Sequence, residues 1–193
     1  MNTPTASGRT VRLADFPTLT AALDFAATGE TGINLHSLRG ELVEALTYAA
    51  LREQAQGLAR RLLAAGSKVG DSVALIAETD GDFVRAFFAC QYAGLVPAPL
   101  PLPAPLGGRE AYIEQIGRMC ASAHARILIG PSGMAEWLKQ IGDAAGLDFA
   151  GPLSELPEDA GATLPQITPE DPCYLQFSSG STPVGKRVLP DEN

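Results

Sequence analysis

The sequence has few cysteines and no long uninterrupted apolar run, and these two absences exclude several classes of protein. Its three cysteines, Cys90, Cys120 and Cys173, stand far apart and form no CxxC pair, which argues against a disulfide framework or a zinc site. We therefore expect buried free thiols. The most apolar stretch, residues 86–108, contains five prolines, and these remove helix hydrogen-bond donors, so a membrane-spanning helix is excluded.

Basic clusters and an N-terminal leader are also lacking. The chain of 193 residues has a net charge of −8, and its Lys and Arg residues form no stripe that could follow a phosphodiester backbone. We therefore expect no nucleic-acid partner. Residues 1–16 contain no apolar segment of the length that a signal peptide needs, and together with the cysteine usage this predicts a cytoplasmic protein.

Apolar periodicity and glycine positions predict alternating helices and strands. A stripe at helical spacing predicts an amphipathic helix over 51–65, which Gly66 would end. The same reasoning predicts helices over 82–93 (ended by Gly94), 109–122 and 132–142, and strands over 72–78, from Leu95, over 126–130 and over 173–177. Because such alternation implies crossover connections, we expect an α/β fold with a mainly parallel sheet covered by helices on both faces.

Composition divides the chain into five parts. We predict an N-terminal extension (1–17), an α/β subdomain (18–150), a linker (151–171), a strand with a phosphate-binding loop (172–186) and a tail (187–193). The linker is rich in Pro, Gly and acidic residues and has no periodicity. Its acids share no rigid face, which favours a solvated surface over a metal site, so no metal ligand is assigned.

The segment YLQFSSGSTPVGK, residues 174–186, is the part that predicts chemistry. A strand runs into small, hydroxyl-bearing and glycine residues, so that backbone amides and hydroxyl groups can converge on one anionic group. Glycine permits positive φ and close backbone approach, and a lysine adds a point charge. The candidate phosphate ligands are Ser178, Ser179, Gly180, Ser181, Thr182, Gly185 and Lys186. The alternative is that this Ser/Gly-rich loop is only a flexible turn.

Residues 180–187 also match the G-x-x-x-x-G-K pattern of nucleotide-binding P-loops. Arg187, however, stands where that motif needs Ser or Thr for the magnesium ion. The motif also requires a helix that meets the phosphates, whereas Pro190 lies in the short segment that follows. The pattern therefore argues against a P-loop NTPase.

Three landmarks resemble the adenylate-forming superfamily of acyl-CoA synthetases, luciferases and peptide-synthetase adenylation domains. They are LTYAAL at 46–51, FFACQYAGLVPAPLPLP at 87–103 and YLQFSSGST at 174–182. The third landmark and the proline-rich turn are most similar to fatty acyl-AMP ligases. The resemblance extends from about Leu19 to Thr182. Beyond it, Pro183 follows Thr182 directly and the family's usual order of lysine and glycine is reversed.

The resemblance implies a two-step ligase. A fatty acid carboxylate would attack the α-phosphorus of ATP, with Mg2+ bound, and release pyrophosphate; the acyl group would then pass to the thiol of an acyl carrier protein or of coenzyme A. The loop over 178–182 would hold the β- and γ-phosphates. In the family, the adenine, ribose and magnesium ligands and the catalytic lysine come from later segments, so no catalytic residue is assigned in this chain.

Two hypotheses follow from this resemblance. The first is an N-terminal fragment of an ATP-dependent fatty acid adenylating ligase, inactive in isolation. The second is a non-catalytic truncated product or interaction subdomain, which would self-associate through apolar surface exposed along 173–177. His36 and His124 fit no hydrolase triad, and we expect structural or solvated roles for them; Trp137 is expected to pack in a helix.

Overall fold

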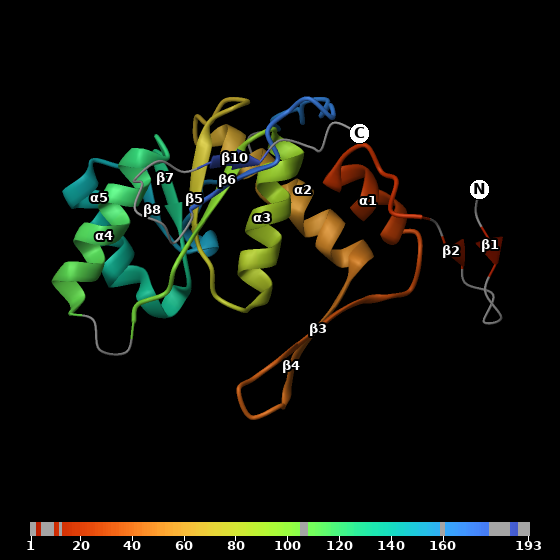
Figure 1. Cartoon of the computed structure of the whole chain (residues 1–193), viewed down its shortest axis with the longest axis horizontal. Helices are drawn as coiled ribbons and strands as arrows, with labels where there is room; N and C mark the ends of the chain where they lie inside the picture. Colours follow the sequence, from red (N-terminus) through yellow and green to blue (C-terminus); the bar gives the residue numbers. More distant parts are fainter. Residues whose placement is uncertain are drawn as a thin grey trace.

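A computed structural model describes residues 3–4, 10–11, 13–104, 108–158, 161–177 and 186–188 of the chain. At its centre lies a four-stranded sheet with the strand order β6-β5-β7-β8 (Figure 1). The strands are β5 (Ser72–Ile76), β6 (Val96–Leu100), β7 (Ile127–Ile129) and β8 (Phe149–Gly151). Every neighbouring pair in this sheet is parallel, which confirms the fold class that the sequence predicts.

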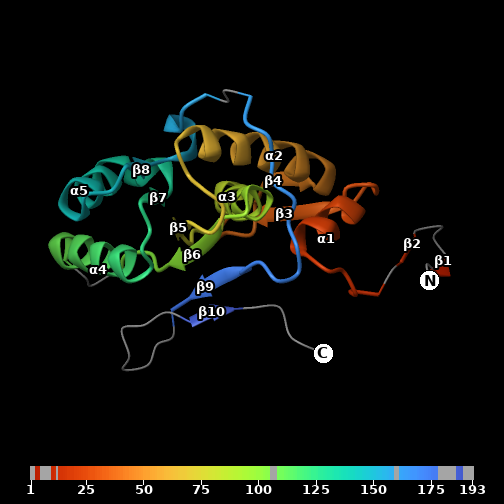
Figure 2. The same cartoon turned by 90° about the horizontal axis from the view of Figure 1, so that it is seen from above.

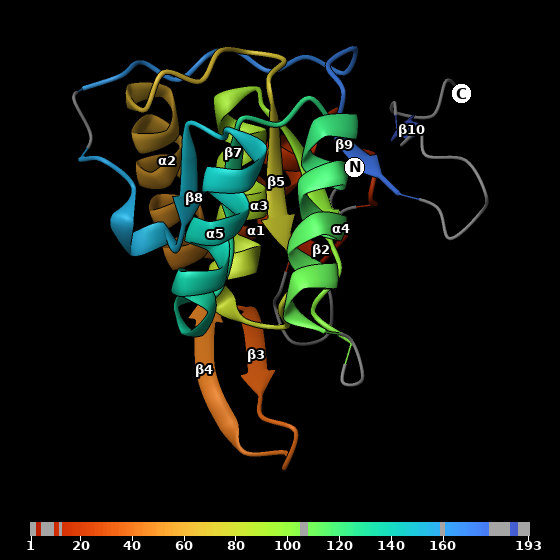
Figure 3. The ribbon, with the colours of Figure 1, turned by 90° about the vertical axis from the view of Figure 1, so that its left-hand side faces the viewer.

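Helices cover both faces of this sheet. On one face α3 (Gly81–Ala93) packs with α2 (Tyr48–Ala64), and on the other lie α4 (Arg109–Ser122) and α5 (Ala135–Ala145), in front of the sheet in Figure 3. Alternate side chains of a strand point to opposite faces. Val73 and Leu75 of β5 accordingly join the core with α2 and α3, whereas Ala74 and Ile76 join the core with α4 and α5.

Capping interactions set the ends of the helices around the sheet. α2 begins at Tyr48, three residues before the predicted start, because the Thr47 hydroxyl accepts a hydrogen bond from the Ala50 amide at 3.1 Å. The Asp80 carboxylate caps α3 in the same way, through the Phe83 amide at 2.8 Å. Gly94 ends α3 with φ of +67°, in the left-handed region that favours glycine, which confirms the predicted stop.

An antiparallel hairpin that the sequence analysis does not anticipate projects from the body of the molecule (Figures 1 and 3). It follows α1 (Leu19–Ala26) and consists of β3 (Gly32–His36) and β4 (Leu42–Thr47). β3 alternates between exposed and half-buried side chains, but Leu42 and Val43, at the start of β4, are both exposed, so the alternation that marks a strand is lost there.

Residues 151–158, at the start of the predicted linker, pack onto α2. They include the short 3-10 helix η2 (Leu153–Glu155), and both Leu153 and Leu156 are buried. Arg61 of α2 donates hydrogen bonds to the carbonyls of Leu156 and Pro157, the latter at 2.9 Å. This stretch therefore belongs to the core that covers α2.

The remaining elements are short. β1 (Thr3–Pro4) and β2 (Thr10–Val11) form an antiparallel pair, and the 3-10 helix η1 (Ser132–Met134) precedes α5. Within the described ranges, no helix combines the length and the apolar character that crossing a bilayer would need.

Candidate phosphate-binding site

The predicted loop connects two short strands that pair with each other. β9 (Tyr174–Gln176) and β10 (Lys186–Val188) are antiparallel, with Gln176 opposite Lys186. The predicted strand over 173–177 is thus confirmed in its central part. β9 and β10 lie side by side (Figure 2), and all of the predicted phosphate ligands except Lys186 fall between these two strands in the sequence.

Packing and hydrogen bonds fix the position of β9. Leu175 is buried against the core formed with α4 and β6, and Phe177 packs on the same core. The Gln91 side chain at the end of α3 donates a hydrogen bond to the Cys173 carbonyl at 2.5 Å. The Tyr174 ring lies 6.2 Å from the Phe87 ring, centroid to centroid. The strand that leads into the loop is therefore held on both of its sides.

β9 also runs toward the end of the sheet where ligands usually bind. Cys173 lies against Gln91, just before the start of β6, and β9 then runs alongside β6 in the same direction (Figure 2). The chain thus leaves β9 at the carboxyl end of the parallel sheet. In open α/β sheets, ligands bind outside this end of the strands.

The candidate ligands themselves fall almost entirely outside the described residues. These are Ser178, Ser179, Gly180, Ser181, Thr182 and Gly185. Lys186 is the first residue of β10, where its backbone pairs with Gln176. The expected convergence of the loop amides on a phosphate therefore stays a prediction, and what the structure supplies is the scaffold on each side of the loop.

A groove of about 830 Å³ lies at the same end of the sheet, between the β3–β4 hairpin, residues 78–82 and Leu102. The described residues of its walls carry four carboxylates, those of Glu44, Glu78, Asp80 and Asp82, and a single cation, Arg85, which is paired with two of them. Like charges repel. The groove is therefore a poor place for a polyphosphate, and the loop after β9 remains the better candidate.

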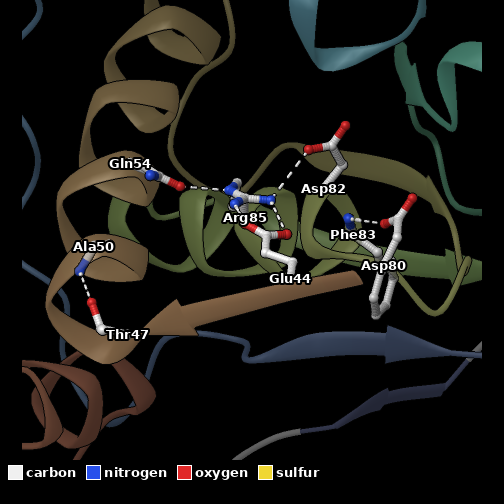
Figure 4. Close-up of polar contacts among 8 residues, drawn as sticks. All are labelled: Glu44, Thr47, Ala50, Gln54, Asp80, Asp82, Phe83 and Arg85. Carbon is white, nitrogen blue, oxygen red and sulfur yellow. Dashed lines mark hydrogen bonds and ion pairs between the residues drawn. The ribbon is translucent and has the colours of Figure 1, made fainter. Parts of the chain in front are cut away.

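One arginine holds the hairpin against the helices beside this groove (Figure 4). Arg85 of α3 pairs with Glu44 of β4 and with Asp82, 3.4 Å away, and donates a hydrogen bond to Gln54 of α2 at 2.5 Å. The Arg85 side chain is 16% exposed, so these bonds are partly shielded from water. Sequence reasoning missed this cluster, because its members are up to 41 residues apart and share no motif.

Arg109 is a second residue that sequence reasoning missed. It begins α4, the next element after β6, and its guanidinium carbon lies 5.2 Å from the centre of the Trp137 ring. Its Nε and Nη2 atoms are buried and have no hydrogen-bond partner in the part of the chain that the structure describes. Trp137 also packs 5.8 Å from the Tyr112 ring, which confirms its expected role in packing.

The cysteines largely follow the sequence expectation. Cys90 and Cys120 are free and buried, and burial raises the pKa of the Cys90 thiol and raises that of Cys120 to about 12. Cys173 is also free but only half-buried, and burial raises its pKa. Among the described residues, no cluster of three or more His, Cys, Asp or Glu side chains could hold a metal ion. His36 and His124 are both exposed.

Comparison with known proteins places this arrangement in a family. The sequence profile of the AMP-binding enzymes matches residues 28–189. The chain belongs to the AMP-binding enzyme family. Among members of this family, a protein of Caulobacter vibrioides that is named as an acyl-CoA synthetase is 76% identical over 189 residues, and a feruloyl-CoA synthase of Amycolatopsis is 35% identical over 141 residues.

Solved structures of AMP-binding enzymes agree with this assignment. A fatty acyl-adenylate ligase, from work on the E. coli and L. pneumophila enzymes, superposes with a TM-score of 0.80 at 40% identity and covers 92% of this chain. A ligase of L. pneumophila in complex with acyl adenylate and pyrophosphate has the same fold at 22% identity, with a TM-score of 0.74. The chain is thus the N-terminal part of the adenylate-forming fold, as its landmarks predict.

The match covers only part of each relative. The match to the Caulobacter protein covers 98% of this chain and 33% of that protein. The match to the feruloyl-CoA synthase covers 72% of this chain and 26% of the synthase. The match to the fatty acyl-adenylate ligase structure covers 32% of the ligase chain. The activities of the whole relatives are therefore proposed for this chain below.

Proposed function

We propose that this chain is the N-terminal part of an ATP-dependent ligase that converts a fatty acid and ATP into acyl-AMP and pyrophosphate and then transfers the acyl group to a thiol. The observation that carries the proposal is the position of β9, which runs alongside β6 toward the carboxyl end of the parallel sheet and precedes the sequence SSGST in the chain. The similarity to fatty acyl-adenylate ligases supports a fatty acid as the substrate.

The chemistry makes a specific demand on this loop. Both reactants are anions, so the enzyme must neutralise the phosphate charge and hold the carboxylate in line with the α-phosphorus. Backbone amides and hydroxyls from Ser178 to Thr182 would bind the β- and γ-phosphates, which become the leaving pyrophosphate. A Mg2+ ion bound with ATP would supply further positive charge, and its protein ligands are proposed to lie in the part of the relatives beyond this match.

The thiol acceptor is proposed as the phosphopantetheine arm of an acyl carrier protein or coenzyme A. The Caulobacter relative is named as an acyl-CoA synthetase, which supports coenzyme A, whereas the carrier protein rests on the resemblance of the loop sequence to fatty acyl-AMP ligases. A second candidate function is that of a non-catalytic interaction subdomain. Of its expected apolar surface along 173–177, Leu175 is 6% exposed and Cys173, Tyr174 and Phe177 are half-buried, so self-association of this surface stays a prediction.

The test is fatty-acid-dependent ATP–pyrophosphate exchange. It would be run on this chain and on a protein in which the chain is continued with the remaining two-thirds of its Caulobacter relative. We expect exchange from the longer protein, its loss on replacing Ser179 and Ser181 by alanine, and none from the 193 residues alone. Fatty-acid-independent exchange, or full activity in the loop variant, would contradict the proposal.

A further inference from the structure

A second cavity lies at the amino end of β9, whereas the predicted loop follows the carboxyl end of this strand in the sequence. The cavity has a volume of about 340 Å³ and is formed by three stretches of chain: residues 14–22, the end of α3 with Gly94 and Leu95, and residues 167–174. At roughly 30 Å³ per non-hydrogen atom or water molecule, it has room for roughly ten such atoms. Small-molecule sites in proteins begin at about this size.

The walls of this cavity are mostly apolar. Phe16 and Leu19 come from the N-terminal stretch, Leu95 from the start of β6, and Ile167 and Pro172 from the segment before β9. Gly94 continues this wall with its left-handed backbone, which turns the chain from α3 into β6. The cavity is therefore suited to a hydrocarbon body.

One charged residue is present among the residues that line the cavity. Asp171 accepts two hydrogen bonds from Thr168, at 2.7 Å from its amide and 3.1 Å from its hydroxyl, and both reach the Oδ2 atom. The Thr168 bonds therefore fix the carboxylate in place, and the other oxygen, Oδ1, accepts no hydrogen bond from the described part of the chain.

The polar groups on the β9 side of the cavity are already paired. The Gln91 amide donates to the Cys173 carbonyl, and its oxygen lies 3.6 Å from the Cys173 sulfur. Asp171 is thus the group that determines which charge the polar end of a ligand can have. An anionic end would be repelled, whereas an ammonium group would gain a charge-assisted hydrogen bond.

We propose that this cavity binds a small amine with an aliphatic or aromatic body, with its ammonium group on Asp171. The site is independent of the proposed ligase activity, because the cavity lies at the amino ends of β6 and β9 whereas the phosphate loop follows the carboxyl end of β9. A fatty acid would be a poor ligand here, since its carboxylate would meet that of Asp171.

Three probes with the same eight-carbon chain test this proposal: octylamine, octanol and octanoate. Binding to the chain is measured by calorimetry, and occupancy of the cavity by protection of Cys173 from iodoacetamide, read by peptide mass spectrometry. Cys173 lines the cavity and is half-buried, whereas Cys90 and Cys120 are buried and serve as internal controls. For ligands of this size we expect octylamine to bind at about millimolar concentration, then octanol, and octanoate least.

Two variants assign the effect to the site. Asp171→Asn removes the charge but keeps an oxygen for the Thr168 bonds. It should raise the Kd of octylamine about threefold to fivefold, about the effect measured for partly exposed ion pairs. The Kd of octanol should change less than twofold. Glu170→Gln, at the neighbouring exposed residue that does not line the cavity, is the matched control and should change neither. Ala22→Phe, on the cavity wall, should abolish binding of both.

The proposal is supported if octylamine protects Cys173 and if the preference for octylamine over octanol and octanoate is lost in Asp171→Asn but kept in Glu170→Gln. Tighter binding of octanoate than of octylamine would overturn it, as would failure of every probe to protect Cys173. If Ala22→Phe does not fold, as judged by circular dichroism, the Asp171→Asn and Glu170→Gln pair still decides the outcome. None of these results depends on ATP, so they remain separate from the exchange assay.

Discussion

Replacing Arg85 with methionine should destabilise the fold and release the β3–β4 hairpin from the helices. Arg85 is the residue that joins Glu44 of the hairpin, Gln54 of α2 and Asp82 of its own helix (Figure 4). Methionine keeps most of the apolar stem of arginine but removes the guanidinium. Glu44 then remains partly buried without its cation.

The exposure of the pair sets the size of the effect. The side chains of Arg85 and Glu44 are 16% and 33% exposed, so the pair lies between a surface ion pair, worth about 0–1 kcal/mol, and a fully buried one, whose disruption costs about 3–5 kcal/mol. We expect a loss of about 2 kcal/mol in the free energy of unfolding. For a chain of this length, that corresponds to a fall in Tm of about 4–8 °C.

Calorimetry and hydrogen exchange would measure this change, with Arg118→Met as the matched control. Arg118 also pairs with a glutamate on its own helix, Glu114 at 3.0 Å, but both side chains are about 70% exposed. The control should change Tm by no more than about 2 °C. In Arg85→Met, exchange should accelerate mainly in residues 32–47. Equal effects of the two variants, or faster exchange spread over the whole chain, would refute the reasoning.

Three further substitutions test the elements around the sheet. Asp80→Ala should lower the free energy of unfolding in urea by about 1 kcal/mol, because α3 loses its cap, and Asp80→Asn should lower it much less. Gln91→Met should cost about 1–3 kcal/mol by leaving the Cys173 carbonyl unpaired, with faster exchange in β9. Burial raises the pKa of Cys120 to about 12, so the folded state keeps a proton that the unfolded state loses near pH 8.5. Stability should therefore fall as pH rises above about 8.5, and Cys120→Ala should reduce that fall in thermal melts.

The parts of the fold that the sequence predicts are those whose causes are local. Gly94 ends α3 as predicted because a left-handed residue after an apolar stripe stops a helix wherever it occurs. The runs at β5 and β7 are buried on both faces, so their apolar character is continuous and easily recognised. These features place the sheet and its covering helices.

The parts that escape prediction depend on contacts between distant residues. In the β3–β4 hairpin, Leu42 and Val43 are both exposed, so β4 begins without alternation, and the attachment of the hairpin through Arg85 and Glu44 joins residues 41 positions apart. The packing of residues 151–158 onto Arg61 is hidden in the same way by a composition typical of loops. The loop motif can be found from the sequence, whereas the cavity beside Asp171 cannot.

The energetics of the proposed loop explain why it would act together with other segments. Three or four hydrogen bonds to anionic phosphate oxygens, at about 1.5–3 kcal/mol each, would contribute about 5–12 kcal/mol. Loss of translational and rotational freedom costs an estimated 4–15 kcal/mol. The loop alone would thus bind ATP weakly, and useful affinity requires contacts to the adenine and to Mg2+. Because β9 is already fixed by Leu175 and by the Gln91 bond to Cys173, those further contacts would not also have to order the strand that carries the loop.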